Sequence, residues 1–297
     1  VRRSGRRVGV AAYGGAYADV LAAGLTPVIY DRGHLEGFRR AAGGRPFSVH
    51  LKVDTGMSRL GVPQDELEGF LDALQRTPGA RIAGLMTHLM AAASDDALTA
   101  EQLQRFTRVQ HALRARGHRP RLLHAANSAA TFRHPSARYD LVRPGIALFG
   151  HAGAPDVGAP LRPALRLRSE IVALRNLRPG DRVGYDGTFT VRRPTRLATL
   201  PIGYGDGLLR AASNRASVLV RGRRCAVVGR VSMDLTTVDV TDVPGVAVGD
   251  EACLLGSQDG PDGTRVSRGR GELAEASGTA PYEVLCAISR RVPRFYR

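Results

Sequence analysis

The chain has 297 residues, 43% of them hydrophobic and 24% charged, a composition that suits a globular protein with one large and one smaller domain. No apolar run approaches the ~20 residues that a membrane span needs, and no signal-peptide pattern opens the sequence, so we expect no membrane partner. The net charge of +16 would suit nucleic-acid binding, but the arginines are scattered and no nucleic-acid module is recognisable. We therefore expect no nucleic-acid partner.

The cysteines and lysines are few. Cys225, Cys253 and Cys286 are widely spaced and odd in number, which favours buried free thiols in a reducing compartment such as the cytoplasm. The same spacing argues against a metal site, and we expect none. Of the 43 lysine and arginine residues only Lys52 is a lysine.

Short apolar runs alternate with helical patterns between residues 8 and 150. Strands are predicted at Val8–Ala12, Pro27–Tyr30, Ser48–Val53, Arg81–Thr87 and Leu122–Ala125, and from Leu141 onward. Strands that alternate with helices indicate a parallel sheet with right-handed crossovers. Six strand–helix units are two fewer than a closed eight-fold barrel needs.

Two helices between these strands can be located from sequence patterns. Leu67, Phe70, Leu71 and Leu74 have the spacing of the buried stripe of an amphipathic helix. A second helix is predicted to start at Thr99, with Gln102 completing a capping box, and to end at Gly117. Its apolar stripe includes Leu103, Phe106 and Leu113.

The hydrophobic periodicity changes after the Gly- and Pro-rich stretch Gly150–Pro163, which we interpret as a linker. From Leu165 the sequence shows β-branched runs separated by turn signals such as Pro179-Gly180-Asp181 and Asp259-Gly260. We therefore predict a partial (β/α) barrel over residues 1–160 and a mostly antiparallel β domain over residues 165–297. Short helices are expected around Glu272–Ala276 and after Tyr282.

One strand of the first domain carries polar residues on a single face. Side chains alternate along a strand, so His50, Lys52 and Asp54 should point together into the barrel. The loop from Gly56 to Arg59 follows at the carboxyl end of the strand, where barrel active sites gather. Taken alone, the pattern would also fit a solvated turn with an ion pair.

Two further segments could bind an anion. In HAANSAA, His124 ends a strand, and Asn127 and Ser128 open a helix whose N–H groups and hydroxyl could hold a phosphate. Simple N-capping would explain the same residues. In VRPGIALFG, Arg143 is followed by Gly145, which lets backbone N–H groups approach an anion.

The second domain also contains candidate site residues. Tyr204 lies between glycines in PIGYGDG at the end of a predicted strand, where it could meet a ligand. A tyrosine in such a place more often packs or forms a hydrogen bond than acts as a base. Met233 and Asp234 lie at a bend in GRVSMDLTTVDV, and Tyr282 lies at a helix start.

Together these segments resemble the alanine racemase family, which uses pyridoxal 5'-phosphate. The resemblance covers nearly the whole chain in the family's order: LKVDTGMSRLG, GLMTHL, HAANSAA, VRPGIALFG, PIGYGDG, GRVSMDLTTVDV and GTAPYEVLCAISRRVPR. It implies a (β/α)8 TIM-type barrel followed by a β domain, and a cytoplasmic homodimer that interconverts L- and D-alanine. Each active site would combine the barrel of one subunit with the β domain of the other.

The resemblance also implies roles for individual residues. Cofactor-binding residues would be His124, Asn127, Ser128, Arg143, the Gly145 and Ile146 backbone, and Tyr282. Arg143 would contact the pyridine nitrogen, and His124 and His88 would orient that arginine and Tyr204 of the partner subunit. Tyr204 would be one of the two bases that racemisation needs on opposite faces of the cofactor. Arg59, Met233 and Asp234 would bind substrate, and Lys52 matches a lysine that is often carbamylated.

The sequence departs from the family pattern at its beginning. The family's cofactor lysine, which forms a Schiff base, lies in a segment like VKADAYGHG, and the nearest match here has Gly9 in place of that lysine. We therefore expect a barrel that lacks its first two strand–helix units. A racemase of broader specificity and an inactive homologue that binds the cofactor or only dimerises are the alternative functions.

Overall fold

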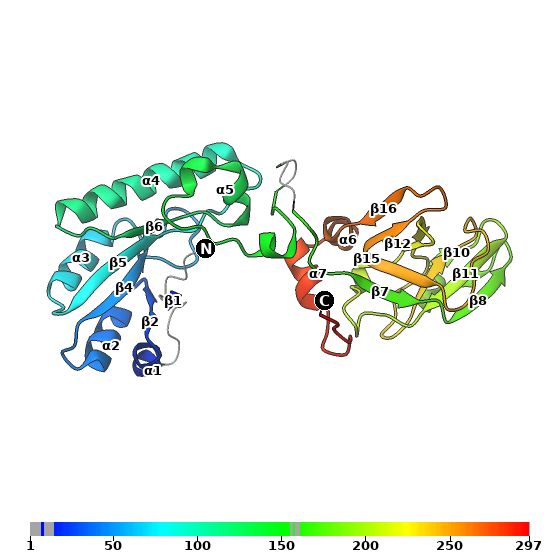
Figure 1. Ribbon diagram of the computed structural model, residues 1–297, viewed down its shortest axis with the longest axis horizontal. Coiled ribbons are helices and arrows are strands. Elements are labelled where there is room, and N and C mark those ends of the chain that lie inside the picture. Colours follow the sequence, from blue (N-terminus) through cyan, green and yellow to red (C-terminus); the bar gives the residue numbers. More distant parts are fainter. Residues whose placement is uncertain (1–6, 9–14, 155–156, 158–160, 297) are drawn as a thin grey trace. The chain divides into compact units, whose positions relative to one another are not determined.

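The computed structural model describes residues 7–8, 15–154, 157 and 161–296, and it divides into two compact units at Arg162 and Pro163. Figure 1 shows helices alternating with strands in the first unit and a second unit made mostly of strands. Among the described residues, no helix is both long and apolar enough to cross a membrane.

The first unit is built on a parallel sheet in the order β3-β4-β5-β6. These strands are Val28–Ile29, Phe47–Lys52, Ala80–Met86 and Leu122–His124. A separate parallel pair joins β1 (Arg7–Val8) to β2 (Leu25–Thr26). The helices are α1 (Tyr17–Ala22), α2 (Arg32–Ala42), α3 (Leu67–Gln75), α4 (Asp96–Ala115) and α5 (Ser128–Arg133), with short 3₁₀ turns at Pro135–Ala137 and Ile146–Phe149. Most of the predicted strand Val8–Ala12 lies outside the described residues.

The core of this unit follows from its apolar spacing. All four residues of the predicted stripe on α3 are buried against the sheet, as expected. Leu51 of β4 and Val53, which follows the strand, are almost fully buried on the helix side, which leaves the opposite face to polar residues.

Two predictions for this unit were wrong. Helix α4 begins at Asp96, because the side chain of Asp95 accepts a hydrogen bond from the Leu98 N–H and caps the helix before Thr99 is reached. The segment from Leu141 does not form a strand and leads into a 3₁₀ turn at Ile146. Pro144 has no N–H for a sheet ladder, which accounts for this difference.

The second unit is antiparallel, as predicted. Its strands are β7 (Leu167–Glu170), β8 (Ala173–Leu177), β9 (Arg182–Val183), β10 (Phe189–Thr190), β11 (Thr195–Leu200), β12 (Ser217–Val220), β13 (Arg223–Ala226), β14 (Thr236–Asp239), β15 (Glu251–Asp259) and β16 (Arg265–Arg268). They form a β9–β10 pair, a sheet β14-β11-β8, and a sheet β13-β12-β15-β16 in which β7 pairs with β15. Helices α6 (Arg270–Ser277) and α7 (Pro281–Ala287) follow, with 3₁₀ turns at Tyr185–Gly187 and Arg210–Ala212.

The three cysteines lie in the second unit and are free thiols. Cys225 and Cys253 are buried, as expected. Cys286 is exposed, which corrects the prediction that all three are buried. The described residues contain no group of His, Cys, Asp and Glu that could hold a metal ion.

Candidate active site

Polar side chains meet at the carboxyl ends of β4 and β6. The rings of His50 and His124 are joined by a 2.8 Å contact between Nδ1 of His50 and Nε2 of His124. His50 lies over Gly84 of β5, where a Cβ atom would come within 2.4 Å of the His50 ring. A glycine is therefore required at that position for His50 to reach His124. His50 lies on the face of β4 opposite to Leu51, as the alternation along the strand predicts.

Arg143 is held in place by several acceptors. Its guanidinium donates to Nδ1 of His124 (2.9 Å) and to the carbonyl oxygens of Thr87 (2.7 Å) and Ala125 (3.0 Å), and Nδ1 of His88 lies 3.5 Å away. Burial lowers the pKa of Arg143 to about 10, so the group stays protonated at neutral pH. The pKa of His88 falls to about 4, because of burial first and then the charges of Arg143, Arg59 and Lys52. The site therefore presents a fixed cation beside neutral histidines.

Ser128 and the backbone of Gly145 converge on one point. Ser128 is the first residue of α5, is almost fully buried, and accepts hydrogen bonds at its Oγ from the N–H groups of Gly145 (2.9 Å) and Ala147 (3.3 Å). A Cβ atom on Gly145 would meet nothing within 4 Å, so there is open space in front of its backbone. These donors suit an anion such as phosphate.

Asn127 is occupied by local structure. It caps α5 by accepting from the Ala130 N–H, and its amide donates to the Leu89 carbonyl. N-capping, which was one explanation of these residues, is thus present at Asn127, while the hydroxyl hydrogen of Ser128 has no acceptor among the described residues.

Lys52 is the last residue of β4, with an exposed fraction of 9%. Its pKa is lowered, first by burial and then by the charges of Arg59 and Arg143, with Asp54 acting in the opposite direction. Asp54 accepts hydrogen bonds from the N–H groups of Gly56 (2.8 Å) and Met57 (2.9 Å), which fixes the loop that leads to the exposed Arg59.

A buried polar network supports this loop and was not anticipated from the sequence. The hydroxyls of Thr55 and Thr87 are 2.8 Å apart, and the Gln102 amide donates to Thr55 and to the His88 carbonyl. The Gln102 carbonyl oxygen accepts from the Met90 N–H. The sequence pattern predicts Gln102 in a capping box, yet it is fully buried and joins the segments that follow β4 and β5.

In the second unit, Tyr204 and Met233 are brought together. The Tyr204 N–H donates to the Ser232 carbonyl (3.0 Å), and the Gly205 N–H donates to the Met233 carbonyl (2.9 Å). The side chains of Tyr204 and Met233 are exposed. Within the described residues no hydrogen bond uses the Met233 N–H, which leaves it available to a ligand. Tyr282, also exposed, is the second residue of α7.

The structure draws attention to a second tyrosine that the sequence analysis did not select. Tyr185 is 69% exposed and is flanked by Gly184 (φ 75°), Asp186 (φ 60°) and Gly187 (φ 55°). A positive φ at a non-glycine residue such as Asp186 costs ~1–3 kcal/mol and is typical of functional segments. Asp186 pairs with Arg230 (2.8 Å), in the segment that continues to Met233. The pattern Gly-Tyr-Asp-Gly, close to that around Tyr204, was the available sequence signal.

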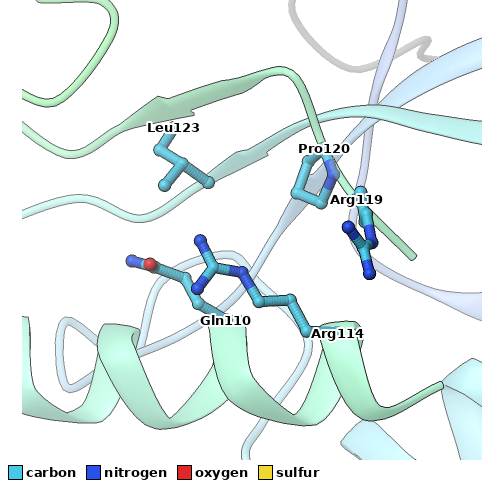
Figure 2. A pocket seen from close by; sticks show the side chains of 5 residues that line it. All are labelled: Gln110, Arg114, Arg119, Pro120 and Leu123. Atoms are coloured by element: carbon cyan, nitrogen blue, oxygen red, sulfur yellow. The ribbon is translucent and has the colours of Figure 1, made fainter. Parts of the chain in front are cut away.

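A separate pocket of about 340 Å³ lies between α4 and the start of β6, and Figure 2 shows the side chains that line it. They are Gln110, Arg114, Arg119, Pro120 and Leu123. None of them was predicted as a site residue. Pro120 precedes β6, whereas His124 ends it, so the pocket lies towards the amino end of the strand.

Comparison with known families gives a match to each unit. Residues 3–153 match the family model "Alanine racemase, N-terminal domain", and residues 164–296 match "Alanine racemase, C-terminal domain". A curated alanine racemase from Sorangium cellulosum (strain So ce56) is 47% identical over 100% of this chain and 81% of its own length.

Solved structures agree. An alanine racemase from Streptomyces coelicolor A3(2) is 35% identical and aligns with a TM-score of 0.86 over 96% of this chain and 76% of its own. An alanine racemase from Bartonella henselae with covalently bound pyridoxal phosphate is 29% identical, with a TM-score of 0.84 over 97% of this chain and 77% of its own. The similarity indicates a shared fold of a barrel followed by a β domain.

Proposed function

The chain belongs to the alanine racemase family, and we propose from this membership that its function is the interconversion of L-alanine and D-alanine with pyridoxal 5'-phosphate as cofactor. The family depends on this cofactor, and the similar Bartonella henselae structure contains it covalently bound. One observation in this chain carries the proposal. A half-buried Arg143, held by several hydrogen bonds, lies near the same strand end as the Ser128 hydroxyl and the Gly145 N–H.

The residues of the first unit fit the cofactor. The Ser128 hydroxyl and the backbone N–H groups of Gly145 and Ile146 would hold its phosphate, together with Tyr282 from the second unit. The Ser128 Oγ lies 2.9 Å from the Gly145 nitrogen, so the hydroxyl and the backbone of this turn lie side by side, which supports this assignment. Asn127 would act indirectly, by capping α5. When bound, pyridoxal phosphate supplies an electron-withdrawing ring that acidifies the Cα–H bond of the amino acid.

Arg143 would donate a hydrogen bond to the pyridine nitrogen without transferring a proton. Its pKa of about 10 keeps it protonated at neutral pH, and its hydrogen bonds to His124 and two carbonyl oxygens hold it still. A ring nitrogen that is not protonated withdraws electrons less strongly. We propose that Arg143 in this way restrains side reactions such as transamination.

Racemisation needs a base on each face of the substrate, and we propose that the second unit of a partner subunit supplies one as a tyrosine. Tyr204 is the residue predicted from the sequence, and His88 would help to orient it. The exposed, strained loop at Tyr185 makes that residue a second candidate for the same role.

A homodimer with shared active sites is part of this proposal. A cytoplasmic location is also proposed, and the free cysteines support it.

The substrate carboxylate would be bound by Arg59 and by the N–H of Met233. No described residue accepts a hydrogen bond from the Met233 N–H, which supports its proposed contact with the carboxylate. We propose that Lys52 is carbamylated. Conversion of its amine to an anion would replace repulsion from Arg59 and Arg143 by attraction.

The proposal can be tested with two polypeptides. One comprises residues 1–297, and the other carries in addition the N-terminal segment of a curated relative that contains the family's cofactor lysine. We expect the second to form D-alanine from L-alanine when pyridoxal phosphate is supplied. A well-folded extended protein that binds the cofactor and leaves L-alanine unchanged would contradict the proposed function.

A further inference from the structure

Arg291, four residues beyond the end of α7, bridges two loops of the second unit. Its Nε lies 3.4 Å from Oδ1 of Asp206, and its Nη2 donates to Oδ1 of Asp234 at 2.5 Å. Asp206 follows Tyr204 by two residues, and Asp234 directly follows Met233. One guanidinium thus joins the Tyr204 loop to the Met233 bend.

The Asp206 end of this bridge closes the turn that contains Tyr204. The Asp206 side chain is only 14% exposed, and its Oδ2 accepts a hydrogen bond from the Gly203 N–H (3.0 Å). The Asp206 carbonyl oxygen accepts from the Ser289 N–H (3.1 Å), which ties the turn to the segment leading to Arg291. Tyr204 therefore lies in a turn held by Asp206 from within and by the chain after α7 from outside.

The Met233 end is packed closely against the same turn. A Cβ atom on Gly203 would lie 2.2 Å from the Ser232 carbonyl oxygen, so this contact requires glycine. A Cβ atom on Gly205 would lie 2.4 Å from Nη1 of Arg291, which places the guanidinium directly against the backbone beside Tyr204. Arg291 thus packs against the two loops at the point where the Tyr204 and Gly205 N–H groups donate to the Ser232 and Met233 carbonyl oxygens.

We propose that Arg291 is a positioning residue that fixes Tyr204 and Met233 relative to each other and to the end of α7. The inference rests on the proposed function, which gives those two residues contact with substrate. It also gives Asp234 a different role from the predicted substrate contact, since its carboxylate is engaged by Arg291. Asp234 acts through the position of the Met233 N–H.

The effect of this bridge is local. The Arg291 side chain is 53% exposed and that of Asp234 is 57% exposed, and ion pairs of such exposure add little to global stability. Loss of the bridge should increase local opening of the two loops and leave the melting temperature of the unit almost unchanged.

The test compares Arg291→Ala, Arg291→Lys and Arg290→Ala in the 297-residue chain by hydrogen exchange with mass spectrometry. Arg290 is the matched control, because it is exposed and makes no hydrogen bond or ion pair with another described residue. We expect Arg291→Ala to speed exchange of the Tyr204 and Gly205 amides roughly fivefold. Arg290→Ala should have no effect, and Arg291→Lys should recover protection only in part, because a lysine lacks the two-armed guanidinium.

The proposal is wrong if Arg291→Ala leaves the exchange rates of these amides unchanged. It is also wrong if Arg291→Lys restores their full protection. Accelerated exchange throughout the second unit with a lowered melting temperature would assign Arg291 to general stability and would also overturn the proposal. In the extended polypeptide with cofactor, Arg291→Ala should lower kcat for L-alanine more than it changes KM. If the extended protein lacks racemase activity but Arg291→Ala still speeds exchange of the two amides, the proposed function is wrong and the positioning role of Arg291 is retained.

Discussion

The guanidinium of Arg143 donates a hydrogen bond to Nδ1 of His124 over 2.9 Å, and this contact determines the protonation of two histidines. Arginine has only donors, so Nδ1 of His124 must be the acceptor and its proton must be on Nε2. That Nε2–H then donates to Nδ1 of His50, which must carry its own proton on Nε2. Both rings are neutral, in agreement with the pKa of His124, which burial and the Arg143 charge lower to about 3.

The first prediction concerns stability. In His124→Phe, Nδ1 of His50 loses its buried donor while Arg143 keeps its two carbonyl acceptors, and a buried polar group without a partner costs ~1–3 kcal/mol. We expect the free energy of unfolding, measured by urea denaturation at pH 7, to fall by about that amount. His111→Phe, at an exposed position on α4, is the control and should stay within ~0.5 kcal/mol of the unsubstituted chain. Equal effects of the two substitutions would contradict a role for His124 in a buried network.

The same contact predicts how stability depends on pH. In the unfolded chain His124 takes up a proton as the pH falls below about 6.5, whereas in the folded chain its pKa is about 3. The unfolded state therefore binds more protons in this range, so this contribution is complete above pH ~6.5 and is lost as the pH falls. By pH 5 the loss from His124 should be roughly 2 kcal/mol.

Urea denaturation at pH 7 and pH 5 measures this loss. In His124→Phe the difference in unfolding free energy between the two values should shrink by about the contribution of His124. An identical pH dependence in both proteins would show that His124 is not held neutral by the fold. The lowered pKa of His50, which also results from burial, acts in the same direction.

Elements marked by a periodic sequence pattern were predicted from the sequence, whereas polar contacts between distant residues were not. The α3 stripe and the strand–helix junction at His124 and Ser128 could be read from the sequence, because apolar spacing and capping residues act over a few positions. The contact of Gln102 with Thr55 joins residues 47 positions apart, and nothing local in the sequence reveals it. The local pattern therefore predicts only a helix cap for Gln102.

Competition between local signals explains the other errors. Thr99 followed by Gln102 is a valid capping pattern, but Asp95 lies earlier in the chain and caps the helix first. Tyr185 was passed over although its glycine-rich surroundings resemble those of Tyr204. Its outward position depends on positive φ at Asp186, which a sequence pattern alone does not establish.

The third prediction separates the two tyrosines. Tyr204→Phe and Tyr185→Phe remove only a hydroxyl, so neither should unfold the protein, and removal of a general base typically costs ~10²–10⁴ in rate. We expect one of the two substitutions in the extended polypeptide to slow deuterium exchange at Cα of L-alanine by that factor, with cofactor binding retained. The sequence resemblance favours Tyr204, and the exposed, strained loop favours Tyr185. Normal exchange in both variants would exclude either residue as the base.

The fourth prediction is that Lys52 reacts with carbon dioxide. Burial and the charges of Arg59 and Arg143 lower its pKa, which increases the neutral amine that forms a carbamate. With ¹³C-labelled bicarbonate, NMR should show a carbamate signal that is absent in Lys52→Arg. Because Lys52 is the only lysine, the amino terminus is the other source of such a signal, and its contribution should persist in the variant. Identical spectra would show that Lys52 is not carbamylated.

The last prediction concerns attachment of the cofactor in the 297-residue polypeptide. Lys52 lies at the end of β4 beside two arginines, and in the family pattern the Schiff-base lysine belongs to a different, N-terminal segment. We therefore expect pyridoxal phosphate to bind to this polypeptide without a covalent bond, and racemisation to be undetectable. Borohydride reduction followed by peptide mapping should find no pyridoxyl group on Lys52, whereas the extended polypeptide should carry one on its added lysine. A pyridoxyl group on Lys52 together with turnover of L-alanine would mean that the β4 lysine can hold the cofactor, and Lys52→Arg should then abolish both.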